Sequence, residues 1–154
     1  MLNDLVIRNA TYRDIGFITE TIIEAEKSFS NKISYCTIFS LSETELIDLL
    51  NLILAENITG QELCYSEYLI ADYNSQYAGT CASWIEGLQG FISAVLKANL
   101  LYTFWGKGKR EKWTLQIENA YVKNEFSGRG IIAQLILEHI RLQILKYPNL
   151  KKFN

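Results

Sequence analysis

The sequence predicts an α/β (α+β) fold with a mixed, mostly antiparallel central sheet flanked by helices. Short runs rich in β-branched and aromatic residues alternate along the chain with segments of helical period. The chain has 154 residues, of which 49% are hydrophobic, so it is long enough to bury one core. We therefore expect a single domain over residues 1–154, with helices packed on a sheet.

The N-terminal part predicts a strand followed by two helices. The run DLVIRNA is the first strand, and Thr11 with Asp14 has the spacing of a capping box that opens a helix to about residue 29. Residues 31–40 have no clean period and are expected to form a loop. The sequence SETE, from residue 42, is a second capping box, and its helix should end near residues 57–60.

The next segment predicts a β-hairpin and an insertion. Two strand-like runs in residues 66–87 are separated by the turn residues NSQ. The apolar insertion at residues 87–105 has mixed spacing, which is compatible with a buried helix, and residues 106–112 form a polar turn. The run WTLQIENAYV should then be a central strand.

A turn containing Gly128 and Gly130 connects this strand to the last helix, after which Pro148 marks a helix end. Glycines let backbone amides crowd at a helix start, where unpaired N–H groups and the helix dipole favour an anion such as pyrophosphate. A P-loop would need a following Lys-Ser or Lys-Thr, and a Rossmann site would need a third glycine where Ala133 stands. A purely structural tight turn stays open as an alternative.

The composition limits the classes of partner that we expect the protein to bind. The net charge is -2, which argues against nucleic-acid binding driven by phosphate neutralisation. No apolar run reaches the length of a membrane span, and no signal-peptide core is present in the sequence. The three cysteines have no metal-binding or disulfide spacing, so we expect no metal, buried thiols and a cytoplasmic protein.

The segment YVKNEFSGRGIIAQLI resembles the cofactor-binding motif of the GNAT superfamily of acyl-CoA-dependent N-acetyltransferases. The family's typical form runs Val-x-Pro-Glu-Tyr-Arg-Gly-Lys-Gly-Ile-Gly-x-x-Leu-Leu. Without gaps, the identical positions are Val122, Glu125, Gly128, Gly130, Ile131 and Leu135. The segments LVIRNATYRDIGFI and YLIADYNSQYAG resemble the family's opening strand and helix and its second and third strands.

The resemblance implies a GNAT-like fold with acetyl-CoA as co-substrate. In that family the pantetheine arm pairs with the strand before the motif, here the backbone of Tyr121, Val122 and Lys123. The pyrophosphate is held by the amides of the turn, here Ser127, Gly128, Arg129, Gly130, Ile131 and Ile132.

Two features depart from the family pattern. Ser127 and Ile132 stand where the family has Arg or Gln and a small residue. The family also continues with a strand, a helix and a hairpin, and KKFN resembles the first residues of that strand, so we expect a C-terminally incomplete GNAT-like domain. There are three alternatives: the chain is truncated, a neighbouring chain completes the cleft, or the insertion replaces the missing part.

Acetyl transfer needs a general base and a polarised thioester carbonyl. Glu118 is the first candidate base, and Glu86 is the second. Glu118 lies on the cofactor strand, and strand alternation places it on the same face as Gln116 and Ala120. Solvent-facing or salt-bridged roles are the alternative for both. His139 and Cys81 are interpreted as packing residues.

The sequence therefore predicts an N-acetyltransferase that moves an acetyl group from acetyl-CoA to an amine of a small molecule, peptide or protein. The alternative is a degenerate or truncated GNAT-like domain that binds acyl-CoA or another protein without catalysis. We expect neither nucleic acid nor membrane as partner. The apolar insertion could bury itself internally or against a second copy, which leaves a homodimer open.

Overall fold

A five-stranded sheet organises the chain, in the order β1-β2-β3-β4-β5. The computed structural model describes residues 4–86, 113–150 and 152–153. The first four strands pair antiparallel, and β5 pairs parallel to the start of β4. The strands are β1 (Leu5–Asn9), β2 (Tyr68–Tyr73), β3 (Gln76–Ile85), β4 (Thr114–Val122) and β5 (Lys152–Phe153). The main helices are α1 (Ile15–Ser30), α2 (Ser34–Phe39), α3 (Glu43–Glu56) and α6 (Ile131–Lys146).

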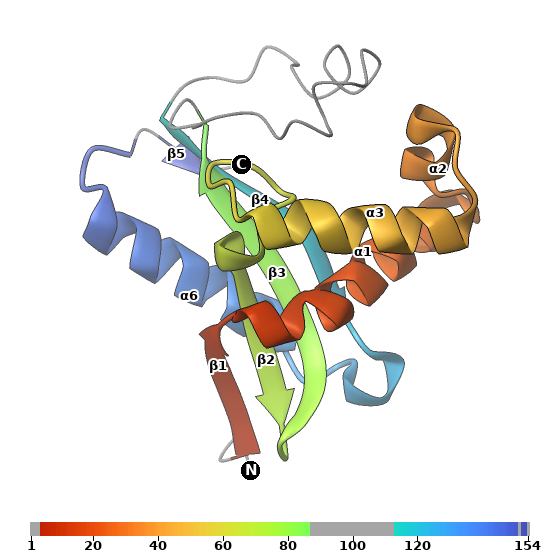
Figure 1. Cartoon of the computed structure of the whole chain (residues 1–154). Coiled ribbons are helices and arrows are strands. Elements are labelled where there is room, and N and C mark those ends of the chain that lie inside the picture. The colour runs from red at the N-terminus through yellow and green to blue at the C-terminus, as the bar shows by residue number, and fades with distance from the viewer. Residues whose placement is uncertain (1–3, 87–112, 151, 154) are drawn as a thin grey trace.

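Helices cover both faces of the sheet (Figure 1). On one face, α1 and α3 bury a large cluster with the sheet, and Ile18, Ile22, Leu50 and Trp84 are among its members. On the other face, α6 buries a smaller cluster around Leu135. The mixed, mostly antiparallel GNAT-like α/β fold predicted from the sequence is therefore confirmed.

Both predicted capping boxes form. Thr11 pairs with Asp14 at the short 3-10 turn before α1, and Ser42 pairs with Glu45 at the start of α3. The expected loop at residues 31–40 is wrong, because α2 occupies residues 34–39 of it. Its first residue follows Ile33, which has no capping side chain, so the usual helix-start signal is missing from the sequence.

The predicted hairpin and the later elements are also present. Asn74 and Ser75 connect β2 to β3 with φ of 50° and 61°. Positive φ at both residues is what a two-residue hairpin turn needs to match the twist of its strands. Residues 152–153 form a strand beside β4, where KKFN was expected to start one. The central strand predicted after the insertion is β4. The predictions for residues 87–112 lie outside the described residues.

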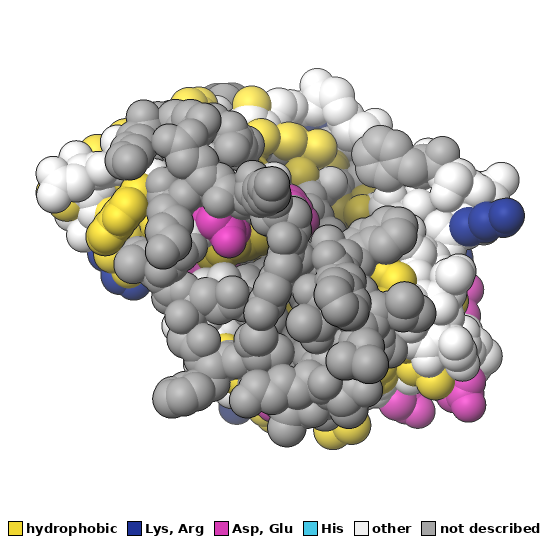
Figure 2. All heavy atoms as spheres, turned by 90° about the horizontal axis from the view of Figure 1, so that it is seen from above, with side chains coloured by type: hydrophobic (Ala, Val, Ile, Leu, Met, Phe, Trp, Pro, Cys, Tyr) yellow, Lys and Arg dark blue, Asp and Glu magenta, His cyan; other side chains and the backbone are white. Residues whose placement is uncertain are grey.

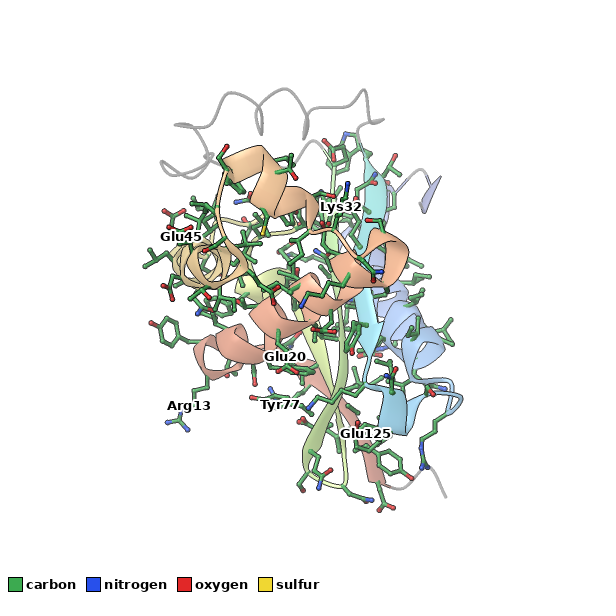
Figure 3. All side chains as sticks on the ribbon, turned by 90° about the vertical axis from the view of Figure 1, so that its right-hand side faces the viewer. Arg13, Glu20, Lys32, Glu45, Tyr77 and Glu125 are labelled. Atoms are coloured by element: carbon green, nitrogen blue, oxygen red, sulfur yellow. The ribbon has the colours of Figure 1, made fainter. Side chains whose placement is uncertain are left out.

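An ion-pair network ties β1 to the start of α1. The buried Asp14 carboxylate accepts hydrogen bonds from Arg8 at 2.8 and 3.0 Å and from the Tyr77 hydroxyl at 2.7 Å. Tyr77 also stacks on Phe17 of α1, with 4.3 Å between the ring centroids, and Figure 3 shows it below this helix. The carboxylate thus joins two neighbouring segments, β1 and the start of α1, to β3, which lies 63 residues further along the chain.

Gly79 of β3 lies directly against β4. A Cβ atom at this position would come within 2.7 Å of the Tyr121 carbonyl oxygen and 2.8 Å of the Val122 side chain. We expect Gly79→Ala to lower the free energy of unfolding by about 1–3 kcal/mol, because β4 must shift to make room. Urea denaturation measures this loss, with Gly16→Ala as control because its added Cβ meets nothing within 4 Å. Equal stabilities of the two variants would contradict the close approach.

Charged side chains of both signs show on the face seen from above. Acidic ones show near its middle and at its lower right edge, and basic ones at its left and right edges (Figure 2). Among the described residues, no helix combines the length and the apolar character needed to cross a membrane.

Candidate functional site

An irregularity in β4 shapes the candidate site. Glu118 pairs with Ala82 and Tyr121 pairs with Thr80, so Asn119 and Ala120 together face the single residue Cys81. This is a β-bulge, and Asn119 adopts a left-handed conformation with φ of 53°. Its side-chain amide donates to the Tyr68 hydroxyl at 3.0 Å, which holds the bulge against β2.

Beyond the bulge, β4 presents unpaired backbone on its outer edge. The amide of Lys123 donates to the Ala78 carbonyl of β3 at 2.9 Å. Alternate residues of a strand direct their backbone groups to the same side, so Tyr121 also faces β3, whereas Val122 and Ala120 face outward. Strand β5 pairs with β4 only at residues 114 and 115, so no described strand covers this outer edge.

The turn after β4 leads into an uncapped helix start. Gly128 and Gly130 have φ of 74° and 72°, a region that glycine enters without steric cost. The first intrahelical bond of α6 joins the Gln134 amide to the Gly130 carbonyl. No described side chain caps this terminus, and the first turn contains no acidic residue. The amides of residues 131–133 and the helix dipole therefore present uncompensated positive charge.

The outer edge of β4 and the start of α6 enclose a cleft of about 410 Å³, a volume suited to a small-molecule ligand. Seven of the predicted cofactor residues line it: Tyr121, Val122, Ser127, Gly128, Gly130, Ile131 and Ile132. Three further lining residues, Ala120, Phe126 and Ala133, were not predicted. The bulge brings Ala120 to the cleft, and nothing in the sequence marks that bulge apart from the tolerance of asparagine for a left-handed backbone.

The side chains of the two remaining predicted cofactor residues contact other parts of the fold, whereas the cofactor contacts predicted for them are backbone ones. The Arg129 guanidinium donates to the Tyr73 hydroxyl at 3.1 Å and lies over its ring. Lys123 lies over the Phe17 ring, 5.5 Å from its centroid. The amide of Ser127 is also engaged, since it donates to the Asn124 carbonyl at 3.1 Å. The hydrogen-bond donors that the turn offers to an anion are therefore those of its backbone rather than of these side chains.

Glu118 lies immediately before the bulge. Its partner Ala82 belongs to the cluster under α1 and α3, so Glu118 faces that side of the sheet. The expectation that Ala120 shares this face is wrong, because Ala120 packs in the cluster under α6. The extra residue of the bulge reverses the alternation.

The surroundings of Glu118 are polar and partly buried. Burial raises the pKa of the neighbouring Tyr68 phenol, and the charge of Glu118 raises it further. Burial also raises the pKa of Tyr121, with smaller contributions from the charges of Glu24, Glu20 and Glu125. Glu20 and Glu24 belong to α1, on which Figure 3 labels Glu20.

Glu86 lies at the other end of the site. Its amide donates to the Thr114 carbonyl at 2.9 Å, which places it opposite the first residue of β4. Four residues of strand separate Thr114 from Glu118, about 13 Å. The fold therefore does not bring the two predicted bases together.

The packing interpretation of the remaining candidates is confirmed. Cys81 is fully buried, and burial raises the pKa of its thiol to about 12. His139 is buried between α6 and β3, where its ring bonds to Ser83 and to the Cys81 carbonyl. Cys36, in contrast, is only half-buried. Among the described residues, no group of three His, Cys, Asp or Glu side chains could hold a metal ion.

Solved structures share this fold at low sequence identity. A possible acetyltransferase from Clostridium difficile 630 superposes with a TM-score of 0.59 at 17% identity, over 97% of this chain and 76% of its own. A GCN5-related N-acetyltransferase from Ralstonia eutropha JMP134 superposes with a TM-score of 0.59 at 12% identity, over 97% of this chain and 82% of its own. A GNAT family acetyltransferase from Brucella melitensis, in complex with acetyl-CoA, superposes with a TM-score of 0.54 at 16% identity, over 97% of this chain and 73% of its own.

No protein-family model and no curated protein matches the sequence. The three likenesses thus concern the fold, and this chain has the GNAT fold.

Proposed function

We propose that this protein is an acetyltransferase that binds acetyl-CoA in the cleft between β4 and α6 and transfers the acetyl group to an amine. The observation that carries the proposal is the uncapped start of α6 beside the unpaired outer edge of β4. The amides of residues 128–132 would hold the pyrophosphate. The outward backbone groups of Val122 and Ala120 would pair with the pantetheine arm.

In the proposed reaction, the neutral amine attacks the thioester carbonyl carbon, a C–N bond forms and the C–S bond breaks. Glu118 would accept the proton that the amine loses, and this proton would pass through water to the departing thiolate. An outward amide of β4, from Ala120 or Val122, would polarise the carbonyl. The negative charge of Glu20 and Glu24 on the α1 side would attract a protonated amine toward the cleft.

The direct test is calorimetric titration with acetyl-CoA, combined with CoA release over a panel of small-molecule and peptide amines. We expect binding and turnover of at least one amine. Absence of binding at about 1 mM acetyl-CoA would contradict the proposal. Binding without turnover of any amine would favour the non-catalytic acyl-CoA-binding module instead.

Substitution of Gly130 tests the pyrophosphate site. We expect Gly130→Asp to weaken acetyl-CoA binding by about 100-fold, because a carboxylate would stand beside the phosphates. Gly130→Asn is the matched control, since it has the same shape and the same strain at φ of 72° but no charge. No atom lies within 4 Å of the added Cβ, so both variants should fold. Equal affinities in calorimetry would show that the glycine only shapes the turn.

A further inference from the structure

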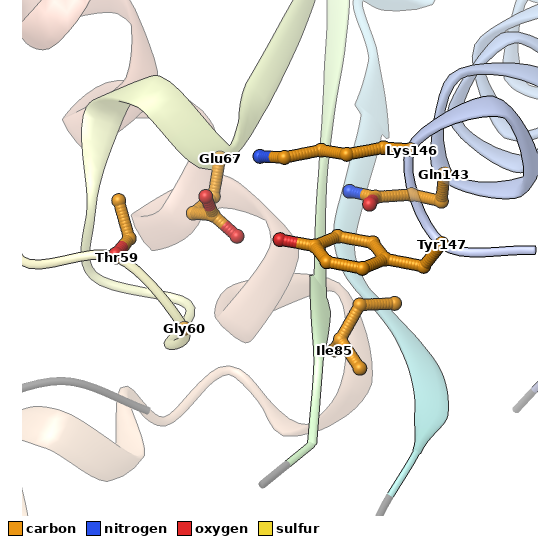
Figure 4. Close-up of a pocket in the computed structure, with 7 residues that line it drawn as sticks. All are labelled: Thr59, Gly60, Glu67, Ile85, Gln143, Lys146 and Tyr147. Carbon is orange, nitrogen blue, oxygen red and sulfur yellow. The ribbon is translucent and has the colours of Figure 1, made fainter. Parts of the chain in front are cut away.

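A second cavity, remote from the cofactor cleft, lies at the C-terminal end of α6. It has a volume of about 90 Å³, and its polar lining comes from Thr59, Glu67, Gln143, Lys146 and Tyr147 (Figure 4). The helix α6, 16 residues and about 24 Å long, separates it from the proposed pyrophosphate site. The cavity is therefore a separate site from the one proposed for the cofactor.

Gln143 supplies an unused hydrogen-bond acceptor to this cavity. Its Oε1 atom is buried and has no partner among the described residues. A buried carbonyl oxygen without a donor is unfavourable, so native proteins usually satisfy such groups with a ligand or water. The side chain projects into the cavity beside Tyr147 and Lys146 (Figure 4).

A chain of buried hydrogen bonds fixes the orientation of this amide. The Nε2 atom of His139 lies 2.7 Å from the Cys81 carbonyl, which only accepts, so Nε2 carries the proton. Burial lowers the pKa of His139, so the neutral ring accepts at Nδ1 from the Ser83 hydroxyl at 2.6 Å. Ser83 Oγ can then accept from Gln143 Nε2 at 3.5 Å. The oxygen of the amide is then directed away from Ser83.

Glu67 and Lys146 add one charge of each sign. Burial raises the pKa of Glu67 to about 7, while Lys146 and the amide of Gly60 act in the opposite direction. No ion pair joins Glu67 to Lys146 in the described part of the chain. Lys146 and Tyr147 are the other titratable groups that line this cavity. Glu67 therefore lies on one side of the cavity, and Lys146, Gln143 and Tyr147 project into it from the end of α6 on the other side (Figure 4).

We propose that this cavity binds the ammonium and carboxylate groups of a free α-amino acid. Its ammonium group would donate to Glu67, and its carboxylate would accept from Lys146 and Tyr147 on the opposite wall. A wider cavity of about 450 Å³ adjoins the first and shares Glu67, Gln143 and Lys146 with it. The amino-acid side chain would extend there, along Tyr68, Leu142 and Leu145.

The test is thermal denaturation and calorimetry of the full chain with each of the common L-amino acids. Methylamine and acetate serve as probes that carry only one of the two charged groups. We expect at least one amino acid to raise Tm at about 10 mM or below, and neither half-ligand to do so. Glu67→Gln and Lys146→Met should each weaken its binding by about tenfold or more.

The matched controls are Glu56→Gln and Lys32→Met, which change exposed residues outside the cavity and should bind the amino acid as the wild type does. Gly130→Asp should also leave this binding unchanged, so the result does not depend on the cofactor site. Absence of binding by every amino acid, unchanged binding in both cavity variants, or equal binding of methylamine alone would overturn the proposal.

Discussion

Replacement of Glu118 by glutamine should lower the rate of acetyl transfer by about 10²- to 10⁴-fold and leave the affinity for acetyl-CoA unchanged. Glutamine keeps the shape of the side chain and cannot accept the proton of the amine. The expectation rests on position, because Glu118 directly precedes the bulge at which the backbone of β4 turns outward. The proposed pantetheine arm would deliver its thioester to that point.

The measurement is kcat and KM for an amine identified from the panel, together with calorimetry of acetyl-CoA binding. Glu86→Gln tests the second candidate base, and Glu56→Gln controls for loss of an exposed carboxylate. Deprotonation of the amine makes the rates of both proteins rise with pH, and the additional rise that follows deprotonation of the base should disappear in Glu118→Gln. A larger loss of kcat in Glu86→Gln would assign the base to the other end of β4.

Asp14→Asn should lower the free energy of unfolding by about 2–4 kcal/mol. The carboxylate is 2% exposed and accepts from Arg8, Tyr77 and the Thr11 amide. An asparagine has one acceptor oxygen, and its NH₂ group would face donors. The Arg8 side chain is 35% exposed, so water compensates part of the loss and keeps it below that of a fully buried pair.

Urea denaturation at neutral pH measures this loss, and Asp72→Asn is the control. Asp72 accepts a single bond from Arg8, at 2.7 Å, and is more exposed than Asp14, so its replacement should cost about 1 kcal/mol. Equal losses in the two variants would contradict a central role for Asp14.

The pH dependence provides an independent check on Asp14. Although burial acts to raise its pKa, the hydrogen bonds from Arg8, Thr11 and Tyr77 hold it well below the ordinary value of 3.8. A depressed folded-state pKa contributes stability that is fully present above pH 3.8 and is lost as the pH falls toward the folded-state pKa. The difference between wild type and Asp14→Asn should therefore shrink below about pH 4.

Local patterns in the sequence were sufficient for most of the fold. The capping boxes at Thr11 and Ser42, the turn at Asn74 and the glycine turn after β4 each depend on residues within a few positions of one another. The short helix α2 was missed because Ile33 gives no capping signal. The family resemblance in the sequence and the fold of the solved acetyltransferases agree on this architecture.

The candidate site was predicted only in part. Seven of the predicted cofactor residues line the cleft, but Arg129 bonds to Tyr73 and Lys123 lies over Phe17. Those partners belong to other elements of the fold, so no spacing along the chain could indicate them. The roles of Glu118 and Glu86 stay predictions.

The sequence by itself determined most of the described strands and helices and where a backbone anion site can form, because propensity, capping and glycine conformation act locally. Only the tertiary structure decided the bulge at Asn119, the outward direction of Ala120 and the meeting of Glu67 with Gln143. The first two depend on the register between β3 and β4, and the third on how α6 crosses the sheet. Register and crossing are set by packing between distant segments, which a local pattern does not encode.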